Sequence, residues 1–125
     1  MSTKKVTEIG KYLRALRAKN NEKLVNMSER ISLSPGMISG IETGKRNIPK
    51  GFASRVQSAY GLNEADAERL RFAIARTKEE AKIDLRGLSP SDAELAIRIA
   101  MAFHRLDNGQ KTVMAQVLDG ALSVS

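Results

Sequence analysis

The chain has 125 residues, of which 42% are apolar and 4% aromatic, with one histidine and no cysteine. This length and composition suit one ordinary folded domain, or a small domain with an appendage. The lack of cysteine excludes disulfides, iron–sulfur clusters and thiolate metal sites, and we expect no cofactor and no metal. The net charge of +7 is the sum of +8 in residues 1–60, which hold 12 Lys and Arg and 4 Asp and Glu, and −1 in residues 61–125, which hold 9 and 10. Such a basic half indicates either a module that binds a polyanion or a basic but inert surface.

Three helices are predicted before residue 45. Within residues 7–19 and 24–31, apolar side chains recur at spacings of three and four, which is typical of helices with one buried face. Ser34 is suited to cap the start of a third helix, because Pro35 can then occupy the first helical position without losing a hydrogen bond. Gly44 is suited to end that helix.

Four more helices are predicted after a basic loop that begins at Lys45. Asn63 resembles an N-cap, and Ser89 with Pro90 begins another helix, whereas Asp107–Gly109 is predicted to be a turn. Apolar stripes place the helices around residues 52–59, 67–74, 95–106 and 113–118. The chain is therefore predicted to be all-α, with a domain at residues 1–80, a linker at residues 81–88 and a helical element at residues 89–125.

No group of residues indicates an enzyme. His104 is expected at the surface of a helix, and Ser123 and Ser125 have no base nearby in the sequence. Phosphate-binding, dinucleotide-binding and metal-binding motifs are missing, residues 1–10 are too polar for a secretory leader, and no apolar run could span a membrane. We therefore expect a soluble cytoplasmic protein that has no enzymatic activity and does not contact a membrane.

The stretch from Leu24 to Gly44 has the pattern of a helix-turn-helix. In that motif, apolar anchors hold the second helix away from the protein body, so that it can enter the DNA major groove, which admits one helix. Leu33 is suited to fill the turn, while Ile38 and Ile41 lie one turn apart on the inner face. The residues then left facing outward, toward the bases, are Ser34, Pro35, Gly36, Ser39, Gly40 and Thr43.

At these residues the chain resembles the XRE/Cro–cI family of lambda-repressor-like helix-turn-helix regulators. The resemblance covers about residues 7–75 and is carried by Ile9–Arg17, Leu24–Ser28 and Ile38–Pro49, the last of which reads ISxIExGKRxIP. It implies a five-helix domain that binds double-stranded operator DNA, usually as a dimer on an inverted repeat. The chain is thus predicted to be a transcriptional regulator, and more specifically a repressor.

The resemblance also implies a buried ion pair between Arg17 and Glu42; the alternative is two separately solvated side chains. Three positions depart from the family pattern. Ser32 stands where the turn usually has glycine, and Ser28 where the second helix usually has alanine. Leu24 replaces a glutamine that usually contacts a phosphate. That contact could instead come from one of two neighbours, Lys23 or Asn26.

The loop after the third helix supplies the other expected DNA contacts. Lys45, Arg46 and Lys50 are suited to bind phosphates, although the same loop could be only a solvated turn. The outward face of the third helix has no Arg, Gln or Asn for bidentate pairing with a base. Sequence specificity is therefore expected from DNA shape, or from Arg46 and Asn47 just beyond the helix.

Protein recognition is the alternative function. The same fold could serve as an adaptor or an antitoxin-like subunit that binds another protein, and the scarcity of donors on the third helix favours that role. The charge asymmetry and the basic loop favour DNA. A self-cleaving peptidase domain, as some phage-type repressors carry, would need about 100 residues, and the helical segment after residue 82 is too short for one.

Residues 88–119 are predicted to form a dimerisation element. At 100° per residue, the apolar side chains of the first helix in this segment cover an arc of about 160°, with Ile97 and Met101 outside it. The last helix adds a second stripe, and two helices alone cannot cover both, so pairing with a second copy is expected. The alternative is that both helices fold back on their own chain. The residues expected at the interface are Leu95, Ile99, Phe103, Leu106, Val113, Met114, Val117 and Leu118.

Overall fold

A computed structural model describes residues 5–122; residues 1–4 and 123–125, which include Ser123 and Ser125, lie outside the described part. Within that part the prediction of an all-helical chain is confirmed, and no strand is present. The elements are α1 (Glu8–Lys19), α2 (Leu24–Ile31), α3 (Pro35–Thr43), α4 (Phe52–Tyr60), α5 (Glu64–Lys78), α6 (Pro90–Ala102), the short 3-10 helix η1 (Phe103–Arg105) and α7 (Asn108–Ala121).

Side-chain caps decide where most of these helices begin. Thr7, Ser34, Asn63 and Ser89 each accept a hydrogen bond from the backbone N–H three residues later, which satisfies a donor that the first helical turn leaves free. Asp107 does the same for α7. Local sequence therefore fixes the start of five helices independently of tertiary packing.

Two boundaries near the end of the chain differ from the sequence-based expectation. The predicted helix through residue 106 ends at Ala102 and continues only as η1. The turn predicted at Asp107–Gly109 is wrong, because the Asp107 side chain accepts from the Gln110 N–H while the Gln110 side chain accepts from the Asp107 N–H. This reciprocal capping box starts α7 at Asn108, so that Asn108 and Gly109 are helical.

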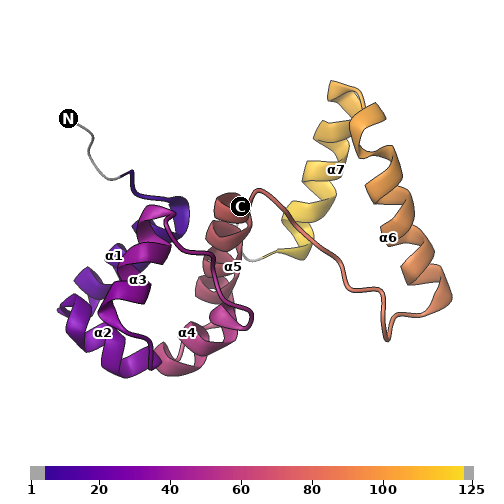
Figure 1. Cartoon of the computed structure of the whole chain (residues 1–125). Coiled ribbons are helices and arrows are strands. Elements are labelled where there is room, and N and C mark those ends of the chain that lie inside the picture. The colour runs from indigo at the N-terminus through magenta and orange to yellow at the C-terminus, as the bar shows by residue number, and fades with distance from the viewer. Residues whose placement is uncertain (1–4, 123–125) are drawn as a thin grey trace. The chain divides into compact units, whose positions relative to one another are not determined.

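The chain divides into two compact units, one ending at Glu80 and the other beginning at Ala81 (Figure 1). All apolar residues buried within the described part lie between Ile9 and Ala73, in the first unit. There α1 packs against α3 and α5, α2 packs against α3 and α4, and α4 packs against α5. In the second unit, no described residue is buried. Among the described residues, no helix is both long and apolar enough to cross a membrane.

A polar cluster fastens both ends of α2 to α4. Glu22 lies just before α2, and its carboxylate accepts a hydrogen bond from the Tyr60 hydroxyl at 2.6 Å and another from the Arg30 guanidinium at 2.8 Å. The same guanidinium lies 4.6 Å from the centre of the Tyr60 ring. The hydrogen bond from Tyr60, aided by Arg30, holds the pKa of Glu22 below its ordinary value, so this carboxylate stays charged and keeps its partners at mildly acidic pH.

Candidate nucleic-acid interface

Two serines that depart from the family pattern lie at the turn between α2 and α3. Ser32 adopts the left-handed conformation, with φ 59° and ψ 44°, that glycine adopts more easily. The Ser28 hydroxyl donates to the carbonyl of Leu33, across the turn, and Arg55 donates to the carbonyl of Ile31 at 3.0 Å. Serine at both positions is thus compatible with a tight turn, because hydrogen bonds from the Ser28 and Arg55 side chains close it.

The inner face of α3 is anchored in the core of the first unit. Ile38 and Ile41 are fully buried, as their spacing predicted, and Leu33 packs against the same core from the turn. Ser34 accepts from the Met37 N–H at 3.1 Å at the start of α3, and Gly44 ends the helix with φ 79°. The helix is therefore fixed at both ends and along one face, which leaves its other face available to a ligand.

The outward side of α3 forms a surface hollow together with the loop that follows it. Ser34, Pro35 and Gly36 are exposed at the start of the helix, and Ser39 and Thr43 are half-buried. The residues that line the hollow are Gly36, Ser39, Gly40, Thr43, Lys45 and Arg46. Four of the six residues expected to face bases and two of those expected to bind phosphate therefore border one concave surface.

Gly40 was expected to lie open on this face, and that expectation is wrong: the residue is buried. A Cβ atom at Gly40 would lie 2.6 Å from Arg46 Cγ, because the aliphatic stem of Arg46 crosses the helix there. The Gly40 carbonyl also accepts from the N–H groups of Lys45 and Arg46, at 2.8 and 3.1 Å. Gly40 thus seats the basic loop on α3, and it is Arg46 that is exposed above it.

Gly40→Ala is therefore expected to weaken DNA binding by roughly 10-fold, because the new methyl group displaces the Arg46 stem while the helix is retained. DNA titrations of Gly40→Ala, Arg46→Ala and the double variant would check this. The double variant should bind no more weakly than Arg46→Ala alone. Full additivity of the two losses would show instead that Gly40 acts independently of Arg46.

The hydroxyl groups on the outward side differ in what they can offer to a base. Thr43 Oγ1 donates to the carbonyl of Ser39 at 2.9 Å, so its oxygen is left as an acceptor. Ser34 Oγ accepts from backbone, so its proton is available to donate. Hydroxyls can pair with several base edges. These contacts therefore offer less discrimination than a bidentate Arg or Asn would.

The remaining predicted contacts are exposed residues that are not among those lining this hollow. Asn47 and Lys50 are exposed in the loop between α3 and α4. Lys23 is exposed at the start of α2. Asn26 is exposed too, but its side-chain oxygen accepts from the Lys23 N–H at 2.8 Å and caps α2. Of these two candidates to replace the missing glutamine, Lys23 has the charged group that a phosphate attracts.

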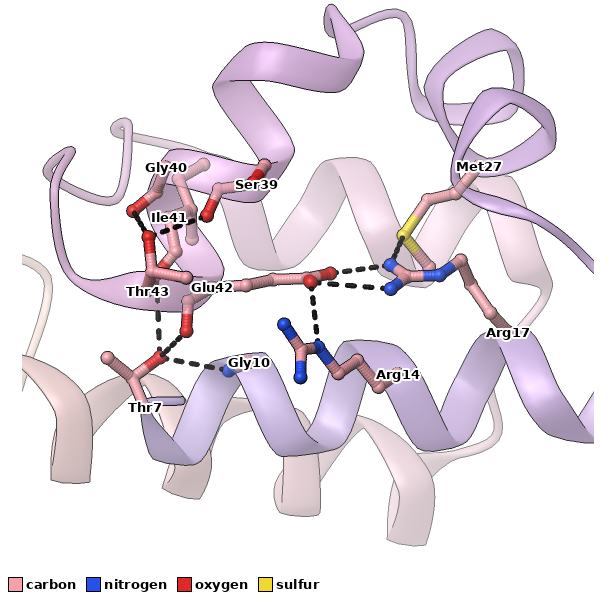
Figure 2. Close-up of polar contacts among 10 residues, drawn as sticks. All are labelled: Thr7, Gly10, Arg14, Arg17, Met27, Ser39, Gly40, Ile41, Glu42 and Thr43. Atoms are coloured by element: carbon pink, nitrogen blue, oxygen red, sulfur yellow. Dashed lines mark hydrogen bonds and ion pairs between the residues drawn. The ribbon is translucent and has the colours of Figure 1, made fainter. Parts of the chain in front are cut away.

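Glu42 is the one buried charged residue among those that the structure describes, with 2% of its surface exposed, and it joins α3 to α1 (Figure 2). Its carboxylate accepts from Arg17 Nη1 and Nη2, and from Arg14 Nε at 3.2 Å. Its backbone carbonyl accepts from the Thr7 N–H at 2.9 Å. The sequence pattern pointed to Arg17 but missed Arg14, although the two arginines are three residues apart and so share one face of α1.

Close packing of backbone accompanies this ion pair. A Cβ atom at Gly10 would lie 2.4 Å from the carbonyl oxygen of Glu42, so only glycine allows α1 to approach α3 this closely. Arg17 also donates to the sulfur of Met27 at 3.4 Å, which connects the pair to α2. The position of α3 is therefore fixed by contacts with α1 and α2.

The eight residues expected at a dimer interface are mostly exposed within the second unit. Leu106 and Met114 are half-buried, and the other six are exposed. Ile97 and Met101, which the sequence-based arc left out, are exposed as well, at 43% and 73%.

Within the described residues, no group of His, Cys, Asp and Glu is placed to hold a metal ion.

Two short helices joined by a tight turn, with the second anchored inside and hollowed outside, define the helix-turn-helix class of DNA-binding proteins. A family model described as a helix-turn-helix domain matches residues 8–70, just over half of the chain. The chain belongs to this family, which is one of the XRE/Cro–cI-like helix-turn-helix families, and the resemblance noted in the sequence is thereby confirmed. No curated protein and no solved structure matches the chain.

Proposed function

We propose that the protein is a sequence-specific regulator of transcription that binds double-stranded DNA as a dimer on an inverted-repeat operator and acts as a repressor. The observation that carries this proposal is the hollow on α3, where uncharged outward residues and two cations of the following loop lie together. Entry of α3 into the major groove would place the cations over the phosphates that border it.

The residues that we assign to phosphate binding are Lys23, Lys45, Arg46 and Lys50. All are exposed, and the three in the loop follow the C-terminal end of α3 closely in the chain. Asn26 and Asn47 are assigned secondary polar contacts. On the base-facing side we assign Ser34, Pro35, Gly36, Ser39 and Thr43, with Gly40 acting through Arg46.

Replacing Lys45, Arg46 and Lys50 together with alanine is expected to weaken binding to every DNA sequence and to reduce the slope of log K against log salt by about 3, because fewer counterions are released. Fluorescence titration at several salt concentrations measures this slope. A matched control replaces Lys11, Arg69 and Arg71, which are equally charged and exposed but lie on α1 and α5. An unchanged slope in the loop variant would remove the loop from the interface.

We further propose that the second unit holds two chains together, through the exposed apolar residues of α6, η1 and α7. Monomeric proteins seldom expose apolar patches of this extent, and two-fold pairing is the commonest way to cover them. A two-fold dimer would present two copies of α3 to successive major grooves, about one turn of DNA apart. Sedimentation of the full chain at micromolar concentration tests this, and a monomer would contradict it.

A protein-binding adaptor is the second candidate, and the hydroxyl-rich outward side of α3 favours it. Such an adaptor would not be retained on double-stranded DNA in a salt-dependent manner. Elution from DNA of random sequence by increasing salt therefore separates the two functions, because phosphate contacts make affinity fall steeply with salt.

A further inference from the structure

Helix α6 has large apolar side chains on opposite sides, and all of them are exposed. Leu95 and Ile99 are 55% and 38% exposed, while Ile97 and Met101, on the other side, are 43% and 73% exposed. Residues two apart on an α-helix point about 200° away from each other, so these pairs cannot share one face. A helix that is apolar nearly all round belongs in the interior of an assembly.

The described part of the second unit does not bury either side of α6. None of its residues between 81 and 122 is buried, and only Ala93, Ala96, Leu106 and Met114 are partly covered. Helices α6 and α7 have 13 and 14 residues, a length at which an isolated helix in water is marginal. Most of their helical stability must therefore come from packing against something else.

Polar contacts hold the junction between α6 and α7, although neither helix has a buried residue. Asp107 and Gln110 cap the start of α7 reciprocally. The Lys111 ammonium lies 5.8 Å from the centre of the Phe103 ring, across the junction. These contacts fix the way in which α7 follows α6, so that both helices can contact the same partner.

A second copy of this segment has the properties of the missing partner. Residues 81–122 hold five Lys and Arg and five Asp and Glu, so two copies do not repel each other as two strongly basic units would. From the start of α6 onward, nine large apolar side chains are exposed: eight lie in α6, η1 and α7, and the ninth is Leu122, the residue after α7. At roughly 100 Å² each, they offer about 900 Å² per chain, close to the ~800 Å² that each partner of a stable complex buries.

We infer that α6 is buried on both of its apolar sides in the dimer, with the α6–α7 segments of two chains interleaved so that they fold only together. This inference rests on the proposed dimer but goes further, because pairing through a single face would bury Leu95 and Ile99 and leave Ile97 and Met101 in water. In the interleaved arrangement, dissociation of the dimer and unfolding of α6 and α7 are one event.

Two pairs of substitutions in the full chain test the inference: Leu95→Lys with Ile99→Lys, and Ile97→Lys with Met101→Lys. Lysine keeps a high helix propensity, so the change acts on burial and not on the helix itself. Each pair is expected to raise the dimer dissociation constant on the order of 100-fold or more, because it puts two charges into the interface. Amide exchange in residues 90–121 should become fast, while residues 8–78 stay protected. Glu94→Lys with Arg98→Gln, on the polar edge of α6, is the matched control and should leave both measurements unchanged.

The possible outcomes separate the inference from the proposed dimer. If Ile97→Lys with Met101→Lys still forms a dimer of wild-type affinity while the Leu95 and Ile99 pair does not, the dimer stands and burial of both sides is overturned. If dilution of the wild type gives monomers whose α6 and α7 amides remain protected, folding is not coupled to association. A wild-type chain that is monomeric at micromolar concentration would overturn the dimer itself.

Discussion

Glu42→Ala is expected to lower the free energy of unfolding by about 3–5 kcal/mol, the usual cost of breaking a buried ion pair by removing one partner. The Glu42 side chain is 3% exposed, and the Arg17 side chain beside it is 12% exposed. Without Glu42, the Arg17 guanidinium stays largely desolvated with no opposite charge, and Arg14 adds a second positive charge nearby. Urea unfolding followed by circular dichroism measures the loss.

The two arginines provide an internal comparison. Arg17→Ala should cost nearly as much as Glu42→Ala, whereas Arg14→Ala should cost less than about 1 kcal/mol, because half of the Arg14 side chain is in water. Glu29→Ala, which removes an exposed carboxylate from α2, is a matched control with little expected effect. A double-mutant cycle between positions 17 and 42 that showed no coupling would contradict this account of the pair.

A chain that ends at Glu80 is expected to stay folded, to be monomeric, and to bind an inverted-repeat operator on the order of 100- to 10,000-fold more weakly than the full chain. In the described part of the chain, every buried apolar residue lies before this point. In the dimer, binding of one DNA-binding domain holds the second one near its half-site at a high effective concentration. The shortened chain loses this contribution to the affinity. Gel-shift titration on an operator compares the two chains.

A single half-site serves as the control for this shortened chain. Each α3 should bind it alone, so the shortened and full chains should have similar affinities for a half-site. Equal affinities on the complete inverted repeat would mean that the second unit does not contribute to cooperative binding. A shortened chain that unfolded would show instead that the first unit depends on residues after Glu80.

Local signals in the sequence predicted much of the fold. The run Ser34-Pro35 marked the start of α3 and Gly44 its end, because capping and proline geometry depend on neighbours in the chain. The spacing of Ile38 and Ile41 predicted which side is buried. The start of α7 was missed, because Asp107–Gly109 contains common turn residues. In the structure the Asp107 side chain caps the helix by accepting from the Gln110 N–H, and the Gln110 side chain accepts in return from the Asp107 N–H.

The candidate site was harder to predict, because it depends on contacts between elements. Spacing along α3 placed Gly40 outside, but the stem of Arg46 folds back over it from the loop. Arg14 was missed as a partner of Glu42 for the same reason, since its role depends on the distance between α1 and α3. Ile97 and Met101 lie outside the apolar arc predicted for α6, yet they are exposed as Leu95 is and equally need a partner surface to cover them.

The fixing of Glu42 at both its carboxylate and its backbone carbonyl has a consequence for how an operator would be chosen. A helix held in this way gains no order on binding, and its short hydroxyl side chains have few rotamers to lose. The protein therefore loses little conformational entropy when it binds. If α3 enters the groove, it is the DNA that must change shape, and its bending and groove width depend on the base steps. Base pairs that no side chain touches would then contribute to selectivity, through the stiffness of the duplex between the two half-sites.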